Sequence, residues 1–396
     1  GVARAIRAAQ RGGGRIRRSR RVRAVKRRAF LVAASLATAS AAAPGRLAAK
    51  ARQPLRILIL GGTRFIGVHM SQLALARGHT LTFFNRGRTK TDLFPEVERI
   101  KGDRNGEIEG LKGRKWDAVI DNSGYVPRHV QLSAEALAPN VGQYLFVSSI
   151  SVYPDLSVPR DESSPVGKLE DETVEKVDGA TYGPLKALCE QAAEAAFPGR
   201  ATVLRPGLIV GPEDNTDRFT YWPARAARGG EMLAPGTPRD RIQVLDARDL
   251  AAFAIRALEK RTYGRFNLVS PPGMFTMGAL VGESVRSARQ LAKPSEPPRP
   301  VWASVEFLEQ HKVEAWSDMP VWVPAKGDGA AFADTPVKRA LDAGLETTPL
   351  RKAVRDTLAW HLQRPAAEQE KLKAGIAPER EREVLAALKA RRAADA

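Results

Sequence analysis

Apolar and polar positions along this chain form alternating blocks with strand and helix character. Several apolar runs have the length and β-prone residues of buried strands. They span residues 55–60, 80–85, 97–101, 116–121, 143–149 and 201–205. Helical patterns lie between them, at 65–77, 128–138 and Thr181–Ala196, with Thr181 as a plausible cap. The alternation predicts an α/β fold, a Rossmann-like doubly wound parallel sheet with right-handed crossovers.

The same pattern divides the chain into segments. Residues 52–210 are expected to form the Rossmann domain, and 366–396 a charged helical tail. Residues 211–365 are expected to form a smaller C-terminal substrate-binding region whose strands and helices return to the Rossmann core. Within it, Arg241–Leu245 is expected as a strand, and the acids of 246–249 as helix caps.

A glycine-rich turn follows the first apolar run. A tight turn between a strand and a helix presents backbone N–H groups to the pyrophosphate of a dinucleotide. The candidate cofactor-binding residues here are Gly61, Gly62, Thr63, Arg64, Phe65, Ile66 and Gly67. Glycine turns after strands are common, so this motif gains weight only from the residues that accompany it.

The end of the second predicted strand bears on the choice of cofactor. NAD enzymes usually place an acid there for the ribose 2′-hydroxyl. This chain has Asn85, Arg86 and Arg88 instead, and guanidinium groups could bind a 2′-phosphate. We therefore predict NADP as the cofactor, with NAD as the alternative; the two arginines could also be plain exposed loop charges.

Ser149, Tyr182 and Lys186 are the candidate catalytic residues. Ser149 ends an apolar run, and Tyr182 and Lys186 share one helix face at i and i+4. A phenol with a pKa near ~10 is a poor acid or base at neutral pH. A neighbouring ammonium would lower that pKa. The three residues predict hydride transfer at a carbinol carbon, although a Tyr-x-x-x-Lys pair also occurs by chance.

The loosely patterned segment after residue 211 is expected to line a substrate pocket. Arg218, Tyr221 and Arg241 are its candidate substrate-binding residues; they could bind a phosphate or carboxylate, or equally lie on the surface. The expected substrate is a small hydroxylated molecule. Epimerase, reductase and dehydratase chemistry stay open at this point.

Charge is concentrated at the start of the chain. The formal net charge is +19, but residues 1–50 hold 14 Lys or Arg and no Asp or Glu, so 19 − 14 leaves +5 for the rest. Nucleic-acid binding by the main body is therefore not expected. The single cysteine, Cys189, excludes an internal disulfide framework, and the five histidines show no metal-ligand spacing, so no metal is expected.

The basic start has the order of a bacterial export signal. An Arg-rich stretch ends in Lys26-Arg27-Arg28-Ala29-Phe30-Leu31, an uncharged stretch at 29–45 follows, and Ala39-Ser40-Ala41 offers a cleavage site. Paired arginines favour the twin-arginine (Tat) machinery and a periplasmic location. The uncharged stretch is short for a stable membrane span. An inert arm in a cytoplasmic protein and an RNA-binding arm are the alternatives.

Several motifs together resemble the extended short-chain dehydrogenase/reductases, and within them the NAD(P)-dependent epimerase/dehydratase family. They are Gly61–Gly67, Val147-Ser148-Ser149 with Val152-Tyr153, Tyr182-Gly183-Pro184-Leu185-Lys186, and Leu204-Arg205-Pro206-Gly207. The resemblance implies that Ser149, Tyr182 and Lys186 form the catalytic trio and that Asp103 lies near the adenine. It also implies a homodimer and offers a nucleotide sugar as one candidate substrate.

One position departs from the family pattern. The family loop usually reads Gly-x-x-Gly-x-x-Gly, whereas the middle glycine is Arg64 here. The string Gly-Gly-Thr-Arg-Phe-Ile-Gly is similar to that of the chloroplast stem-loop RNA-binding proteins and related bacterial oxidoreductases. This leaves an alternative function, a catalytically silent Rossmann-fold protein that binds RNA or a protein partner.

Overall fold

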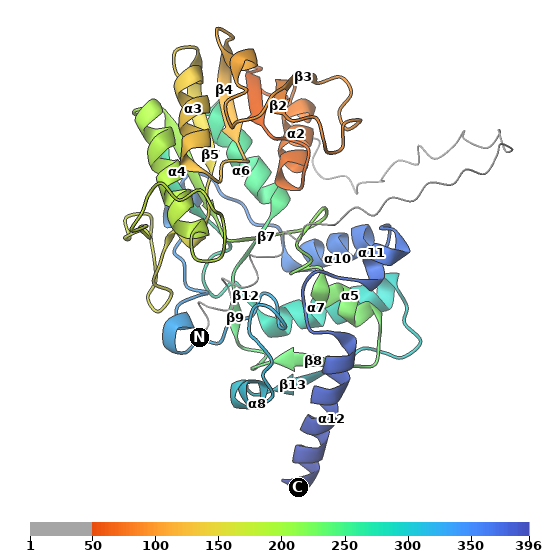
Figure 1. Ribbon diagram of the computed structural model, residues 1–396. Coiled ribbons are helices and arrows are strands. Elements are labelled where there is room, and N and C mark those ends of the chain that lie inside the picture. Colours follow the sequence, from red (N-terminus) through yellow and green to blue (C-terminus); the bar gives the residue numbers. More distant parts are fainter. Residues whose placement is uncertain (1–49, 396) are drawn as a thin grey trace, which may run out of the picture.

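The computed structural model describes residues 50–395, and a seven-stranded parallel sheet forms its upper lobe in Figure 1. The strand order is β11-β6-β5-β4-β1-β2-β3, and every neighbouring pair is parallel. The strands are β1 (Arg56–Leu60), β2 (Thr80–Asn85), β3 (Glu98–Lys101), β4 (Trp116–Asp121), β5 (Val141–Val147), β6 (Ala201–Pro206) and β11 (Gly264–Leu268).

Helices cover both faces of this sheet because its strands are apolar on both sides. Ile57 and Ile59 of β1 belong to one buried cluster, with α2 (Ile66–Ala76) and α6 (Ala247–Glu259). Leu58 and Leu60 of the same strand belong to a second cluster on the opposite face. That face is covered by α3 (Pro127–Leu137) and α4 (Tyr182–Ala196). Strand alternation thus confirms the doubly wound fold.

The strand order places a crevice beside β1. The chain runs outward from β1 through β2 and β3, then returns to β4 on the other side of β1. Ligands of such sheets bind beyond the carboxyl ends of the strands at this reversal. The glycine-rich turn follows β1 directly and therefore lies at this point.

A second lobe packs below the sheet around its own core (Figure 1). Its large buried side chains include Trp222 and Trp322. Its elements are α5 (Tyr221–Ala227), β8 (Glu231–Pro235), α7 (Met277–Leu291), β13 (Arg299–Ala303), α8 (Val305–Gln310), α10 (Leu350–His361), α11 (Ala366–Glu370) and α12 (Pro378–Ala394).

Short elements connect the two lobes. β7 (Leu208–Val210) pairs in parallel with β10 (Val244–Asp246), and β9 (Arg241–Ile242) pairs antiparallel with β12 (Phe275–Thr276). The remaining helices are the 3₁₀ turns η1 (Glu109–Leu111), η2 (Ile150–Val152) and η3 (Gly327–Gly329), and α9 (Lys338–Asp342). β11 and α6 come from the segment after residue 211: β11 is the edge strand of the main sheet, and α6 packs on one of its faces.

Three local expectations differ from the structure or are refined by it. The strand expected at Arg241–Leu245 is split into β9 and β10 at Gln243, whose side-chain amide donates to Ser270 O and Thr335 O. Thr181 makes no side-chain cap; its hydroxyl donates to Lys176 O. Asp246 does cap α6, because its carboxylate accepts from the Arg248 N–H at 2.9 Å.

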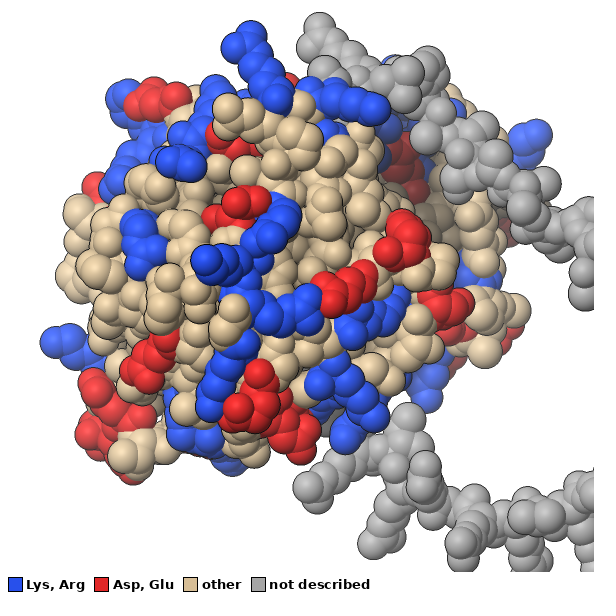
Figure 2. Space-filling view, turned by 90° about the horizontal axis from the view of Figure 1, so that it is seen from above, with Lys and Arg blue, Asp and Glu red and all other residues tan. Residues whose placement is uncertain are grey.

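The basic segment 1–49, with the expected export signal, lies outside the described residues. Within residues 50–395, no helix has the length and apolar character to cross a membrane. Figure 2 shows Lys and Arg interspersed with Asp and Glu over the face seen from above. This mixture agrees with the modest net charge of the chain after residue 50.

Candidate functional site

A cavity of about 1040 Å³ opens at the carboxyl ends of the strands. Its wall combines the glycine-rich turn, the loop after β2, the residues after β4, the turn after β5 and the start of α4. The segment from Gly207 to Arg218 closes one end, with Trp316 and Phe332 from the second lobe. Segments far apart in the sequence therefore meet at one site.

The glycines of the turn after β1 are required by its geometry. Gly61 and Gly62 have φ values of 119° and 91°, which favour glycine. A Cβ on Gly62 would lie 2.7 Å from the Phe83 ring, and one on Gly67 would lie 2.8 Å from the Gly62 Cα. The turn therefore packs too closely on itself and on β2 for any side chain at these positions.

Arg64 occupies the position where the family pattern has a glycine, and its side chain is exposed. Its guanidinium Nη2 lies 3.4 Å from the Thr89 hydroxyl, in the loop after β2. No side chain caps the start of α2 in the described chain, and the residue before it, Phe65, has a φ of 34°. The arginine thus reaches across the mouth of the turn while the first turn of α2 faces the cavity.

The loop after β2 forms the other wall at this end. The Asn85 amide donates to Gly61 O at 3.0 Å and accepts from the Gly87 N–H at 2.9 Å, so it ties the two loops together. Arg86 lies 3.9 Å from the Asp103 carboxylate, and both side chains keep contact with solvent. Arg86, Arg88 and Asp103 all line the cavity.

Ser149 and Tyr182 meet where β5 and α4 converge. Ser149 caps η2, and its Oγ accepts from the Ser151 N–H at 3.0 Å. A Cβ on Gly183 would lie 2.0 Å from Ser151 O, so α4 begins directly against the turn after β5. The Ser149 hydroxyl also donates to the Ser151 hydroxyl at 3.0 Å, and its position beside Tyr182 lowers the pKa of that phenol.

The electrostatics of Tyr182 differ from the sequence expectation. Burial raises the pKa of Tyr182 above its ordinary value, and the nearby Tyr125 adds to the rise. The neighbouring Ser149 hydroxyl and the charge of Arg218 lower that pKa, but by less. Burial thus sets the direction of the shift, and the lowering of the Tyr182 pKa by an ammonium that the sequence predicted is not found.

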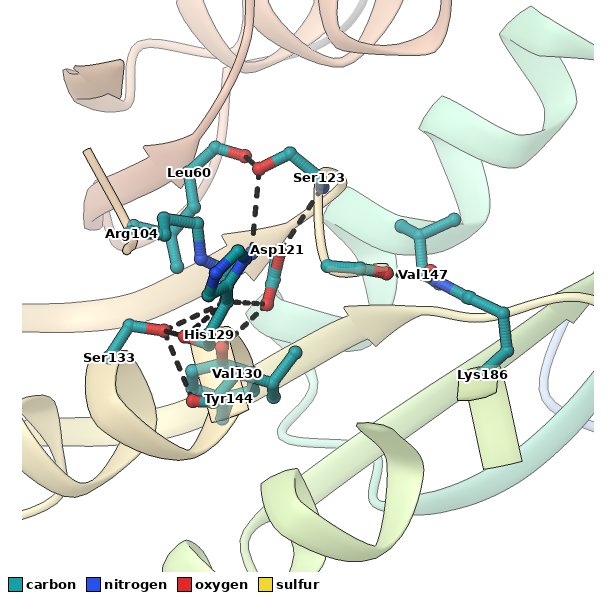
Figure 3. Close-up of polar contacts among 11 residues, drawn as sticks. Leu60, Arg104, Asp121, Ser123, His129, Val130, Ser133, Tyr144, Val147 and Lys186 are labelled. Carbon is teal, nitrogen blue, oxygen red and sulfur yellow. Dashed lines mark hydrogen bonds and ion pairs between the residues drawn. The ribbon is translucent and has the colours of Figure 1, made fainter. Parts of the chain in front are cut away.

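Lys186 is buried beneath the cavity floor, one helical turn after Tyr182. Its Nζ donates to Gly124 O and Val147 O, both at 2.7 Å. Figure 3 shows the side chain directed at Val147. Burial lowers the pKa of Lys186 to about 8. The ammonium has three N–H donors, so two carbonyls leave one donor for another partner.

The three candidate substrate residues fall in different places. Arg218 lines the cavity, and its guanidinium lies 5.5 Å from the Trp316 ring centroid. Tyr221 is 1% exposed and packs edge-on against Trp222 in the second core, because it faces inward on α5. The sequence could not distinguish its apolar role from a binding role, and Tyr221 does not line the cavity.

Arg241 also lies outside the cavity lining. Its guanidinium pairs with the Asp334 carboxylate at 2.6 Å, and the side chain is half exposed. Gln243, two residues further along, lines the cavity instead. The strand is interrupted at Gln243, between β9 and β10, and the apolar pattern gave no sign of this break.

Residues after β4 complete the site and were not singled out from the sequence. Asn122, Ser123 and Tyr125 line the cavity. The sequence did contain a signal for these site residues. The apolar strand Trp116–Asp121 is followed by polar residues, and strand ends of a parallel sheet lie at the same edge as Ser149.

Asp121 is the centre of a buried polar cluster under these residues (Figure 3). Its carboxylate accepts two hydrogen bonds from the Arg104 guanidinium, at 2.6 and 2.7 Å, and one from the Tyr144 hydroxyl at 2.7 Å. The Ser123 hydroxyl donates to Leu60 O at 2.7 Å. The cluster therefore fixes the ends of β1, β4 and β5 against one another beneath the cavity.

A second buried cluster lies beside the candidate catalytic residues. Arg205 donates to the Glu190 carboxylate through Nε and Nη2, and through Nη1 to the Tyr153 hydroxyl at 2.9 Å. The Ser148 hydroxyl donates to Glu190 at 2.5 Å. Tyr153 and Arg205 belong to motifs that carried the family resemblance, and here they pack the turn after β5 onto α4 and β6. Within residues 50–395, no group of three or more His, Cys, Asp or Glu could hold a metal ion.

A protein-family model matches residues 57–268, more than half of the chain, and its description is the NAD dependent epimerase/dehydratase family. The chain belongs to this family. The match reaches every strand of the main sheet and includes Ser149, Tyr182 and Lys186, whereas Trp316 and Phe332 of the cavity lie beyond it. Membership of the epimerase/dehydratase family confirms the resemblance drawn from the motifs.

The relatives of this epimerase/dehydratase chain include proteins of different kinds. It is 27% identical over 250 residues to the chloroplast stem-loop binding protein of 41 kDa b from Arabidopsis thaliana. That match covers 57% of this chain and 61% of the relative, so the chain spans about three fifths of that protein's length.

Two solved structures share the fold. The Bordetella bronchiseptica enzyme WbmH, in complex with NAD⁺, has 17% identity and a TM-score of 0.56, covering 78% of this chain and 99% of that chain. The human epimerase family protein SDR39U1 (isoform 2), with NADPH, has 22% identity and a TM-score of 0.51, covering 77% of this chain and 99% of that chain.

Proposed function

We propose that this protein is an NADP-dependent oxidoreductase or epimerase of the extended short-chain dehydrogenase type. The observation that carries the proposal is the meeting of Ser149, Tyr182 and the glycine-rich turn in the wall of one cavity, above the buried Lys186. Glycines that leave no room for a Cβ fit the close approach of a pyrophosphate. The cavity volume suits a dinucleotide with a small substrate beside it.

In this proposal, each residue of the site has a separate role in hydride transfer. A bound nicotinamide dinucleotide would supply or accept the hydride. Tyr182 would give or take the proton of the substrate hydroxyl, and Ser149, which lines the same cavity, would hold the substrate oxygen in line. The third donor of Lys186 would orient a ribose hydroxyl while its other two hold the floor of the site.

NADP is favoured over NAD by the loop after β2. Arg86 and Arg88 are exposed at the cavity rim, and the carboxylate of Asp103, which also lines the cavity, is paired with Arg86. A 2′-phosphate would meet two guanidinium groups there. The human SDR39U1 structure contains NADPH and the WbmH structure NAD⁺, so both cofactors occur among proteins of this fold.

The substrate end of the cavity favours a small hydroxylated molecule that carries an anionic group. Arg218 supplies a cation there, and Trp316 and Phe332, 5.3 Å apart and edge-on, supply apolar ring surface. A nucleotide sugar has these properties and is one candidate. Turnover with net consumption of NADPH would indicate a reductase, and turnover without it an epimerase.

Two measurements test the proposed function: the identity of the bound nucleotide and the turnover of a Tyr182 variant. Protein purified from cells is denatured, and the released nucleotide is identified by mass spectrometry; NADP or NADPH is expected. Turnover is then measured with a panel of nucleotide sugars and sugar alcohols. Tyr182→Phe is expected to lower kcat by roughly 10²–10⁴-fold, because the phenol's proton transfer is lost. Equal turnover by the variant would contradict the mechanism.

A catalytically silent binding protein is the second candidate. The similarity to the Arabidopsis stem-loop binding protein and the arginine at position 64 of the glycine turn favour it. A gel shift of stem-loop RNA by the chain without residues 1–49 would support binding by the main body. The +5 charge of the chain after residue 50 argues against that result.

We propose that residues 1–50 direct export through the twin-arginine machinery to the periplasm, with a cytoplasmic protein as the alternative. The support is the order of charged, uncharged and small residues in this segment. The segment is fused to a reporter that folds in the cytoplasm, and the periplasmic fraction is measured. Arg27→Lys with Arg28→Lys is expected to abolish export; unchanged export would contradict the proposed role of the twin arginines.

We also propose that the protein forms a homodimer, as the family resemblance implies. Analytical ultracentrifugation would measure its oligomeric state.

A further inference from the structure

Tyr125 is a large aromatic side chain in the cavity wall that no motif accounts for. It follows β4, and 47% of its surface is exposed. The residue before it, Gly124, has no room for a side chain, since a Cβ there would lie 2.6 Å from the Phe146 ring. The backbone therefore passes tightly over Phe146 and brings Tyr125 to the edge of the catalytic residues.

Tyr125 lies beside both Tyr182 and Lys186. Its ring centroid lies 6.3 Å from that of Tyr182, with an angle of 39° between the rings. The Lys186 Nζ lies 5.3 Å from the Tyr125 centroid and 4.1 Å from the Phe146 centroid. The carbonyl of Gly124 accepts one of the ammonium's hydrogen bonds at 2.7 Å. Two aromatic rings and two carbonyls thus lie around the cation and leave one of its three N–H donors without a carbonyl partner.

We propose that Tyr125 is a positioning residue of this site: its ring covers part of the Lys186 ammonium beside the cavity and limits its contact with water, while one N–H donor stays directed at the cofactor site. An aromatic face attracts a cation but solvates it less well than water does. The cover therefore keeps Lys186 close to losing its proton while its two carbonyl partners hold it in place. The hydroxyl of Tyr125 is not needed for this role.

Other charges around Lys186 are already balanced by fixed partners. Asp121 lies in the ion pair with Arg104, and Glu190 in the ion pair with Arg205. Cys189, one turn along α4, is a buried thiol whose pKa burial raises to about 12, so it is uncharged at neutral pH. Burial is the largest cause of the lowered pKa of Lys186, about 8. Removing the cover should therefore raise that pKa.

The test follows the titration of Lys186 directly, without cofactor or substrate. The full chain is produced with ¹³C-labelled lysine, and the Cε chemical shifts are recorded by NMR from pH 6 to 11. The Lys186 signal is assigned by its loss in Lys186→Gln. Tyr125→Ala, Tyr125→Phe and the matched control Tyr263→Ala, an exposed tyrosine away from the cavity, are compared with the parent chain.

The midpoint of Lys186 is expected near pH 8 in the parent chain, Tyr125→Phe and Tyr263→Ala. In Tyr125→Ala it should rise by at least about one unit, toward the ordinary ~10.4. An unchanged midpoint in a folded Tyr125→Ala, or an equal rise in Tyr125→Phe, would overturn the proposal. A role of Tyr125 in catalysis rests on the proposed function. The titration of Lys186 needs neither cofactor nor substrate, so its outcome tests the effect of Tyr125 separately from cofactor binding and turnover.

Discussion

Individual side chains at this site combine burial with charge in ways that the sequence alone does not reveal. Tyr182 and Lys186 were predictable as a pair, from their spacing and the strand-end Ser149. Their pKa values were not, because each depends on what covers the residue and which carbonyls accept its hydrogen bonds. Burial raises the pKa of Tyr182 and lowers that of Lys186, so both residues are held toward their uncharged forms.

The buried Lys186 predicts a pH-dependent stability. Its pKa is about 8 in the folded chain and ~10.4 when unfolded. Below pH 8 both states are protonated, and the penalty for the buried charge is fully present. Between these values the unfolded chain binds more protons, so the free energy of unfolding rises with pH. Urea denaturation of the parent chain and Lys186→Met should show this relative gain between pH 8 and 10; a constant difference would contradict it.

Arg86 should contribute to cofactor choice. It is exposed at the cavity rim, and its Asp103 partner lies 3.9 Å away, which leaves the guanidinium able to reach a phosphate. Arg86→Ala is expected to weaken NADPH binding by roughly tenfold, about 1.4 kcal/mol, with little effect on NADH. Arg114→Ala, an exposed arginine paired with Glu98 away from the cavity, serves as the control. Calorimetric titration measures the affinities of the parent chain and of both variants for NADPH and for NADH, and equal losses for both nucleotides in Arg86→Ala would contradict the assignment.

At the scale of elements, the site depends on how closely α4 approaches the turn after β5. Gly183→Ala places a Cβ 2.0 Å from Ser151 O, so the start of α4 must shift. The expected cost is about 1–3 kcal/mol in the free energy of unfolding, with weaker turnover because Tyr182 moves from Ser149. Thermal and urea denaturation measure the cost.

Gly282→Ala in α7 is the matched control, since nothing lies within 4 Å of its added Cβ. Alanine is the better helix former, so this variant should be neutral or more stable by up to about 1 kcal/mol. Similar losses in both variants would show that the close approach of α4 is not what Gly183 provides.

The elements of the sheet were predictable because apolar runs and turn residues follow local rules. β2 and β4 have the expected bounds, Thr80–Asn85 and Trp116–Asp121. The second lobe was not predictable in detail. Its strand β8 pairs with β13, far along the chain, and the inward direction of Tyr221 is set by packing between distant helices. Periodicity does not specify such long-range pairings.

At the scale of the whole molecule, the charged C-terminal helix is part of the second lobe. Glu381 of α12 is buried, and its carboxylate pairs with Arg225 of α5 at 2.6 Å and accepts from the Leu233 N–H at 3.0 Å. Val384 and Leu388 of the same helix belong to the core of that lobe. The sequence predicted a charged helical tail here, because the many charged residues of α12 outnumber the few that face the core.

Glu381→Ala would leave the buried Arg225 unpaired and should cost about 3–5 kcal/mol of unfolding free energy. Glu383→Ala, two positions on, removes an exposed partner of Arg380 and should change stability by less than about 0.5 kcal/mol. Urea denaturation distinguishes the two. A small effect at Glu381 would mean that α12 adds little to the second lobe.

The central claim is that a nicotinamide dinucleotide occupies the cavity with its reactive ring beside Tyr182 and Lys186. A crystal structure of the protein with NADPH tests it most directly. We predict the pyrophosphate against residues 61–67, the adenosine beside Arg86 and the nicotinamide at Tyr182. A cavity that takes no nucleotide under saturating NADPH, or a guanidinium of Arg64 seated where the pyrophosphate should lie, would contradict it.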